Sequence, residues 1–166
     1  GMETLSYISP ITSLALVDAL VLVSRRGFVK KLKASMAQSI LANRYLGTAA
    51  SQNADRTLDL ILCAPHERLV LASSEGYLLC LESNSLPYSL DEAIRLSGTD
   101  HLVSAFTLRP DQPILIMTQI GKLLQQTPDA LACTSSLKTK GSPVFSAQLR
   151  AQGVRVVSAA CVSQEH

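Results

Sequence analysis

The sequence predicts an all-β domain made of three copies of one four-stranded repeat, arranged like the blades of a β-propeller. An apolar–turn–apolar segment occurs three times, and a second glycine follows each copy at a nearly constant distance. The repeat length of 43–51 residues is typical of a propeller blade. With 166 residues, of which 47% are hydrophobic and 17% charged, the chain can bury one core, and this composition excludes a disordered protein.

The repeated segment spans residues 20–31, 69–80 and 114–125. Each copy is an apolar run, a Ser or Thr, two variable residues, a glycine and a second apolar run. This pattern predicts a β-hairpin, because the glycine can adopt the positive φ of a tight turn. The hydroxyl three residues before the glycine can accept a hydrogen bond from the turn backbone.

A second glycine follows the first after 20–22 residues in every copy. The predicted turn glycines are therefore Gly27, Gly47, Gly76, Gly98, Gly121 and Gly141. Further apolar strands are expected at residues 13–17, 58–62, 102–106 and 154–158. Because there are four of these strands and only three hairpins, the blades are expected to share strands across their boundaries.

We predict one domain over residues 2–166, and Gly1 is interpreted as a remnant of cloning. The repeats cover about 13–50, 58–100 and 102–144, and a closing strand covers about 154–162. Residues 33–45 and 89–96 have helical composition, and the second begins like a capping box. They are interpreted as connections that contain a helical turn.

Three blades leave an open apolar flank, since closed propellers contain four to eight. We expect two chains to form a homodimer in which each supplies half of a ring, or the chain to pack on a larger partner. The first residues lack the basic-then-apolar pattern of a signal peptide, and the longest apolar run is too short to span a bilayer, so a cytoplasmic protein without membrane contact is expected.

The four cysteines and three histidines are scattered along the chain. They predict reduced core cysteines and no metal site. No phosphate-binding loop, nucleophile elbow or zinc-protease motif occurs, so neither catalysis nor a cofactor is expected. The net charge is +4 over residues 1–50, −5 over 51–113 and +3 over 114–166.

The repeat resembles that of the C-terminal domain of DNA gyrase A and of the equivalent domain of topoisomerase IV. Residues 21–31 match the family's apolar run, Ser or Thr, two residues, Gly, aromatic or aliphatic residue, Val and Lys. Residues 139–144 resemble its lysine–glycine stretch before the next blade. The resemblance implies a β-pinwheel with strand exchange between blades and a basic rim that bends DNA, placed beside a DNA-cleaving core. The chain departs from the family in having fewer blades and no basic glycine-rich box.

Binding of DNA without sequence reading needs cations that neutralise phosphates. The candidate DNA-binding residues are Arg25, Arg26, Lys30, Lys31, Lys33, Arg44, Lys122, Lys138 and Lys140. Glu75, at the turn position of Arg26 in the next repeat, is expected to repel phosphate. The predicted function is that of a non-catalytic domain that binds the duplex DNA backbone non-specifically and in a salt-dependent way, bends the DNA, or docks near a topoisomerase core. The alternative is a protein-interaction module that uses an open blade edge and no nucleic acid.

Overall fold

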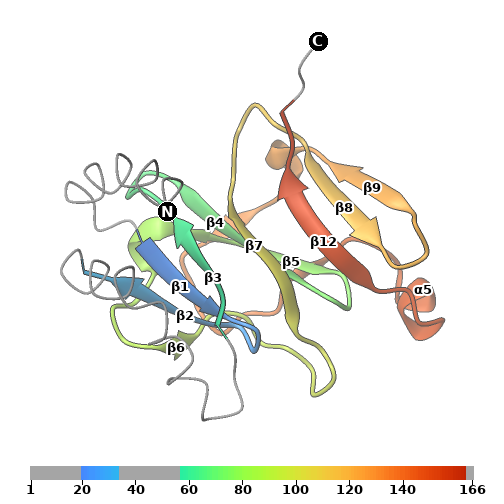
Figure 1. The fold of residues 1–166 in the computed structure, drawn as a ribbon, viewed down its shortest axis with the longest axis horizontal. Coiled ribbons are helices and arrows are strands. Elements are labelled where there is room, and N and C mark those ends of the chain that lie inside the picture. The colour runs from blue at the N-terminus through green and yellow to red at the C-terminus, as the bar shows by residue number, and fades with distance from the viewer. Residues whose placement is uncertain (1–19, 34–56, 164–166) are drawn as a thin grey trace, which may run out of the picture.

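The computed structural model describes residues 20–33 and 57–163 of the chain, which form three largely antiparallel sheets (Figure 1). The strands are β1 (Leu20–Ser24), β2 (Phe28–Leu32), β3 (Thr57–Leu62), β4 (Arg68–Ser73), β5 (Tyr77–Glu82), β6 (Asp91–Glu92), β7 (Leu102–Thr107), β8 (Ile114–Thr118), β9 (Leu123–Gln126), β10 (Cys133–Thr134), β11 (Ser142–Pro143) and β12 (Val156–Cys161). Two 3-10 turns, η2 (Ser83–Ser85) and η3 (Pro128–Ala130), and one short helix, α5 (Ala147–Ala151), complete the described part. Among these residues, none of the helices is long and apolar enough to cross a membrane.

The three predicted hairpins are confirmed as β1–β2, β4–β5 and β8–β9. Their turn glycines have φ values of 89° at Gly27, 90° at Gly76 and 79° at Gly121. The predicted role of the preceding hydroxyl is also confirmed: Ser24 Oγ accepts from Phe28 N at 3.1 Å, and the second and third hairpins make the same contact at 3.2 and 3.1 Å. The sequence pattern thus satisfies the backbone of each turn locally.

We number the three sheets in chain order. The first is β3-β1-β2-β6, the second is β10-β5-β4-β7 with β11 also on β5, and the third is β12-β8-β9. The expected four strands per sheet hold only for the first. The second sheet has five because the connection after β9 pairs with β5 at two places, and the third has three because no described segment pairs with the outer side of β9.

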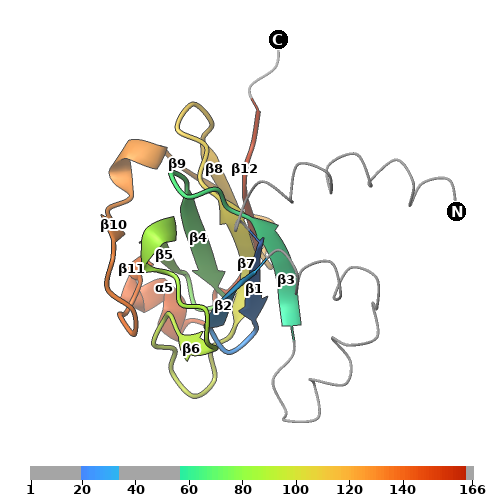
Figure 2. The ribbon, with the colours of Figure 1, turned by 90° about the vertical axis from the view of Figure 1, so that its left-hand side faces the viewer.

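The sheets exchange strands, as expected. β6 lies in the connection after the second hairpin, yet it pairs with β2 of the first sheet. β10 and β11 lie in the connection after the third hairpin, yet they pair with β5 of the second sheet (Figure 2). The connection that follows a hairpin therefore adds an edge strand to the sheet of the preceding hairpin.

The prediction of a helical turn in residues 89–96 is wrong, because this segment contains the strand β6. The outer edge of β2 offers it backbone partners: Lys31 N donates to Pro87 O at 2.6 Å, and Ala93 N donates to Gly27 O at 2.8 Å. Pairing at this edge outweighs the local helical signal. The other segment with helical composition, and the strand expected at residues 13–17, lie outside the described residues except for Lys33.

Most of the core of the described residues lies in two layers, one on each face of the second sheet, and a small third cluster joins Leu20, Leu32 and Leu60 in the first sheet. Leu69 and Leu71 of β4 pack toward the first sheet, whereas the alternating Val70 and Ala72 pack toward the third. The strands of the second sheet are therefore apolar on both faces, which explains their unbroken hydrophobic runs. The outer face of the third sheet leaves Met117 and Leu123 exposed.

Two cysteines form a disulfide, which corrects the expectation that all four are reduced. Cys80 of β5 is bonded to Cys133 of β10, 53 residues further along the chain. The bond links an exchanged strand to the strand that receives it. Cys63 and Cys161 are free.

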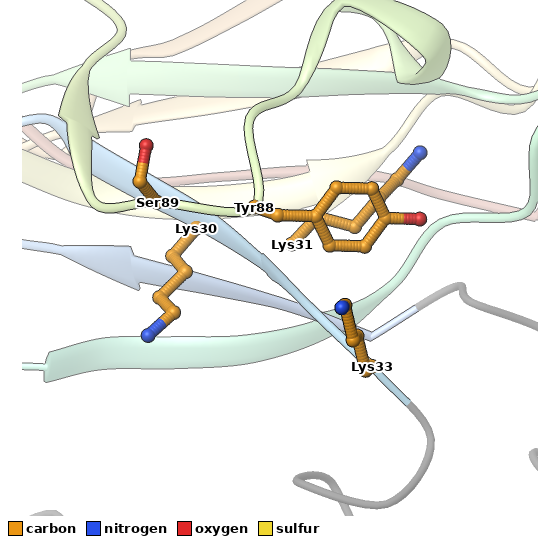
Figure 3. Close-up of a pocket in the computed structure, with 5 residues that line it drawn as sticks. All are labelled: Lys30, Lys31, Lys33, Tyr88 and Ser89. Carbon is orange, nitrogen blue, oxygen red and sulfur yellow. The ribbon is translucent and has the colours of Figure 1, made fainter.

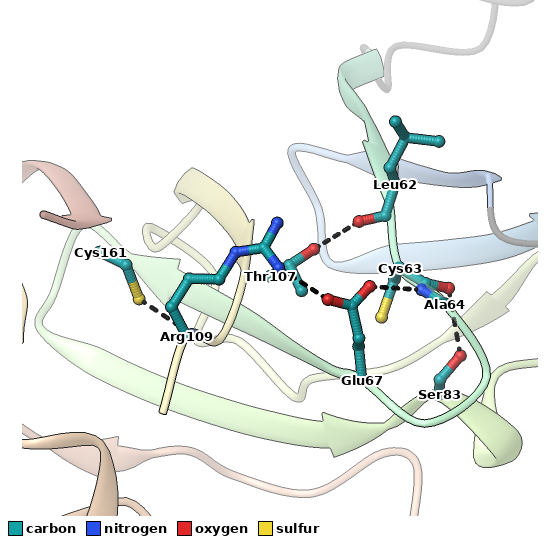
Figure 4. Close-up of polar contacts among 8 residues, drawn as sticks. All are labelled: Leu62, Cys63, Ala64, Glu67, Ser83, Thr107, Arg109 and Cys161. Carbon is teal, nitrogen blue, oxygen red and sulfur yellow. Dashed lines mark hydrogen bonds and ion pairs between the residues drawn. The ribbon is translucent and has the colours of Figure 1, made fainter. Parts of the chain in front are cut away.

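Polar contacts join the ends of strands from all three sheets (Figure 4). The Glu67 carboxylate accepts from Arg109 Nη1 at 2.7 Å and from Ala64 N at 2.8 Å. Arg109 N in turn donates to Cys161 Sγ of β12 at 3.4 Å, and Thr107 of β7 donates to the carbonyl of Leu62 in β3. This network connects residues of all three sheets at one end of the stack.

Cys63 is expected to resist alkylation in the folded protein. Burial raises the pKa of its thiol, and the thiolate is the reactive form. Iodoacetamide at pH 8 should modify the partly exposed Cys161 within minutes and Cys63 only after unfolding, as mass spectrometry of peptides would show. Because the folded-state pKa is raised, the thiol contributes stability below its ordinary pKa of about 8.5, and this contribution is lost as pH rises further. Rapid native labelling of Cys63 would contradict its placement in the core.

Candidate nucleic-acid interface

The first hairpin turn carries two exposed arginines. Arg25 and Arg26 occupy the turn between β1 and β2, as the sequence predicts, and both are exposed. The turn is fixed against the second sheet because Leu102 N of β7 donates to Arg25 O at 2.7 Å. The three hairpin turns lie along the same side of the molecule (Figure 1).

The lysines of β2 divide between the two faces of the strand. Lys31 and Lys33 lie beside Tyr88, with Nζ to ring-centroid distances of 5.7 and 6.0 Å, whereas Lys30 points away from the ring (Figure 3). These residues and Ser89 line a shallow depression. An exposed aromatic ring between ammonium groups can hold cations by cation–π attraction and offers a flat surface to a sugar or base.

Lys31 is not exposed like its neighbours. Only 7% of its surface is accessible, and its ammonium group lies 5.7 Å from the centroid of the Tyr88 ring. Lys33 remains exposed and Lys30 half-buried. The available cations are therefore Lys30 in β2 and Lys33 directly after it.

Strand exchange brings a lysine of the third repeat to the edge of the first sheet. Lys138 N donates to Ala93 O at 3.0 Å, and its Nζ lies 3.5 Å from Asp91 Oδ1. Arg95, a cation that the sequence analysis did not single out, is exposed next to it, and its N–H donates to Thr139 O at 2.9 Å. The ion pair to Asp91 reduces the positive charge that Lys138 adds here.

A second aromatic–cation group lies on the second sheet. Lys140 Nζ is 5.0 Å and Arg150 Cζ is 4.5 Å from the centroid of Tyr77. Arg150 also donates to the carbonyls of Glu75 and Phe145, at 2.7 and 3.2 Å. Sequence reasoning missed Arg150 and both tyrosines, although Tyr77 stands at the repeat position of Phe28, directly after the turn glycine.

The remaining candidate DNA-binding residues do not lie in the aromatic–cation groups around Tyr88 and Tyr77. Lys122 is exposed in the third hairpin turn. Arg44 and Gly47 lie outside the described residues. At the second turn, Glu75 accepts from Ser97 Oγ at 2.8 Å and from Thr99 Oγ1 at 3.0 Å. The side with the hairpin turns therefore carries a carboxylate between its cationic ends.

The other predicted glycines differ in their surroundings. Gly141 lies against β5, where an added Cβ would come 2.7 Å from Leu78 O. Gly98 lies in an exposed turn with nothing within 4 Å of such a Cβ. In the two described stretches, no group of three His, Cys, Asp or Glu side chains could hold a metal ion.

The three sheets, joined by exchanged strands, define the fold as a β-pinwheel of the kind found in topoisomerase C-terminal domains. The C-terminal domain of DNA topoisomerase IV is similar, with a TM-score of 0.66 and 18% identity, over 87% of this chain and 46% of that one. The E. coli ParC C-terminal domain is similar at 0.66 and 16%, over 87% of this chain and 62% of that one. The chain thus spans about half of the first structure and just under two thirds of the second.

A DNA gyrase A C-terminal domain is also matched, with a TM-score of 0.42 and 10% identity, over 86% of this chain and 65% of that one. No protein-family model and no curated protein matches the sequence. The resemblance seen in the sequence is confirmed by the topoisomerase IV structures at the level of the fold.

Proposed function

We propose that this domain binds the backbone of duplex DNA without sequence preference, as a non-catalytic partner of a DNA topoisomerase core. The observation that carries the proposal is the group of cations on the first hairpin, with exposed Arg25 in the turn, Lys30 along β2 and Lys33 beside Tyr88. The fold supports it, because the similar structures are C-terminal domains of DNA topoisomerase IV and of ParC.

The geometry suits phosphate contacts better than base reading. The five residues of β2 extend over roughly 17 Å, about the length of five base pairs along a duplex. Arg25 before this strand, Lys30 within it and Lys33 directly after it are spread along this direction and can each approach a separate phosphate and release counterions. The acidic second turn confines the contact to the first sheet and to the basic residues that strand exchange brings to its edge.

Replacing Arg25, Lys30 and Lys33 by Ala is expected to weaken binding and to reduce its salt dependence. If each side chain contacts one phosphate, the slope of log K against log salt should become less negative by about 2.7. Fluorescence anisotropy with a labelled duplex between about 50 and 200 mM salt measures this slope. AT-rich and GC-rich duplexes should lose affinity equally.

Arg68→Ala is the matched control for the single variant Lys33→Ala. It also removes one exposed cation, but Arg68 is on the second sheet and is paired with Glu82 at 3.3 Å. It should change neither affinity nor slope appreciably. Binding that is independent of salt, or an equal loss from both single variants, would refute a phosphate-binding surface on the first sheet.

A further inference from the structure

The second strands of the three hairpins have equivalent outer edges, and two of these edges are occupied. β2 is paired with β6, and β5 is paired with β10 and β11, whereas β9 ends the third sheet (Figure 1). The occupying segments come from the following repeat in both cases. The third edge presents the same kind of strand with no described segment on it.

The two occupied edges are built alike. Ala93 N donates to Gly27 O, and Val144 N donates to Gly76 O, both at 2.8 Å. The residue after each donor covers the turn glycine: a Cβ added at Gly27 would lie 2.6 Å from Ile94 Cγ2, and one at Gly76 would lie 2.6 Å from Phe145 Cζ. Each exchanged segment thus combines a backbone hydrogen bond with a large apolar side chain placed over the glycine.

The third edge has the same backbone but lacks these contacts among the described residues. Gly121 has a similar φ, and no atom lies within 4 Å of an added Cβ. Leu123 is 54% exposed, whereas Val29 and Leu78 at the same repeat position are 0% and 2% exposed, because each of those two lies in a core layer shared with the next sheet and no described residue packs on the outer face of the third sheet. The surface over Gly121 is therefore uncovered among the described residues.

The backbone of β9 also has donors aimed outward. Thr118 N bonds to Lys122 O, so the Met117–Leu123 and Leu115–Gln125 pairs are the non-hydrogen-bonded pairs of this antiparallel ladder. The N–H groups of Leu123 and Gln125 therefore point away from β8. Residues 123–126 include no charged residue or proline of the kind that usually protects an exposed edge.

We propose that the outer edge of β9, with the surface over Gly121, binds an extended segment of a partner polypeptide. The partner should have the chemistry of this chain's own exchanged segments, residues 91–94 and 142–145. The first segment reads Asp-Glu-Ala-Ile and the second reads Ser-Pro-Val-Phe. In both, a small apolar residue is followed by a large apolar residue at the last position. The segment adds a strand to β9 and places its large apolar side chain on Gly121. This binding needs neither DNA nor the first sheet.

The test uses the full chain with a copy of residues 139–146 fused after its last residue through a flexible Gly/Ser linker, which raises the local concentration of the segment to about millimolar. Hydrogen exchange followed by NMR should show the amides of Leu123 and Gln125 protected at least about tenfold relative to the unfused chain. The matched control fusion carries Ser in place of the copied Phe145 and Pro in place of the copied Val144, and should give no protection. Gln125→Pro in the receiving strand, which removes an outward N–H that the hairpin does not use, should abolish the protection of the remaining reporter amide, that of Leu123.

Unchanged exchange at both amides in the fusion, with the fold intact by circular dichroism, would overturn the proposal. So would equal protection from the control fusion, because the apolar side chain would then play no part. Protection that increases with concentration in the unfused chain would identify a second copy as the occupant and overturn the assignment to a separate partner. Loss of DNA binding in the first-sheet variants leaves this readout unaffected, so the two proposals fail independently.

Discussion

Removing the Cys80–Cys133 disulfide is expected to lower the free energy of unfolding by about 4 kcal/mol. The bond closes a loop of 53 residues in sequence, and a cross-link of this span greatly restricts the unfolded chain. It also holds β10 on β5, so its loss should loosen the exchanged segment first. Urea denaturation with and without reductant, together with the double variant Cys80→Ala and Cys133→Ala, measures the effect.

The control for this prediction is Cys161→Ser, which leaves the disulfide intact. Reductant should lower the free energy of unfolding of this control variant, whereas it should leave that of the double variant unchanged. An unchanged unfolding midpoint on reduction of the wild-type chain would show that the bond does not stabilise the fold. Native-state hydrogen exchange would locate the weakened region, with the amides of β10 expected to lose protection before those of β4.

Gly27→Ala is expected to destabilise the protein by about 3 kcal/mol and Gly121→Ala by only about 1 kcal/mol. Both glycines have positive φ, so an alanine meets similar backbone strain at each. At Gly27 the new methyl group also collides with Ile94, including its backbone oxygen at 3.0 Å, and the exchanged segment must move. At Gly121 the methyl group has open space.

Thermal or urea unfolding of the two variants gives the comparison directly. The difference between them measures how tightly the exchanged segment packs on the first sheet, since the strain largely cancels. Equal losses would mean that the segment moves aside without cost, which would contradict a rigid junction between the first two sheets.

The hairpins could be predicted from the sequence because everything that specifies them is local. Ser24, Gly27 and the flanking apolar residues lie within one short segment, and the same residue types recur in the other two copies. The longer strands that follow the second glycines are visible for the same reason. The apolar runs of β4 and β5 are continuous because the second sheet is buried on both faces.

The exchanged strands could not be predicted residue by residue. β6, β10 and β11 have two residues each, too few for an alternating pattern, and their partners lie in another repeat. The disulfide was missed because it depends on this pairing, which brings together cysteines far apart in sequence. The aromatic–cation groups around Tyr77 and Tyr88 were missed for the same reason, since their cations come from other segments.

The burial of Lys31 shows a second limit of sequence reasoning. A lysine in a basic stretch is expected on the surface, but the segment around Pro87 lies along the edge of β2, where Lys31 N donates to Pro87 O. The ammonium group of Lys31 lies beside the ring of Tyr88 in that segment, and the residue is buried. The accessible cations in such a stretch depend on which strand covers its edge.

Strand exchange also governs how this protein can fold during synthesis. The first sheet lacks its outer strand until residues 91–94 have left the ribosome, and the second waits for residues 142–145. Truncation at a repeat boundary should therefore yield an incomplete, aggregation-prone product instead of a shorter stable domain. Unlike a solenoid, whose units can melt one by one, this chain should unfold in a single cooperative transition.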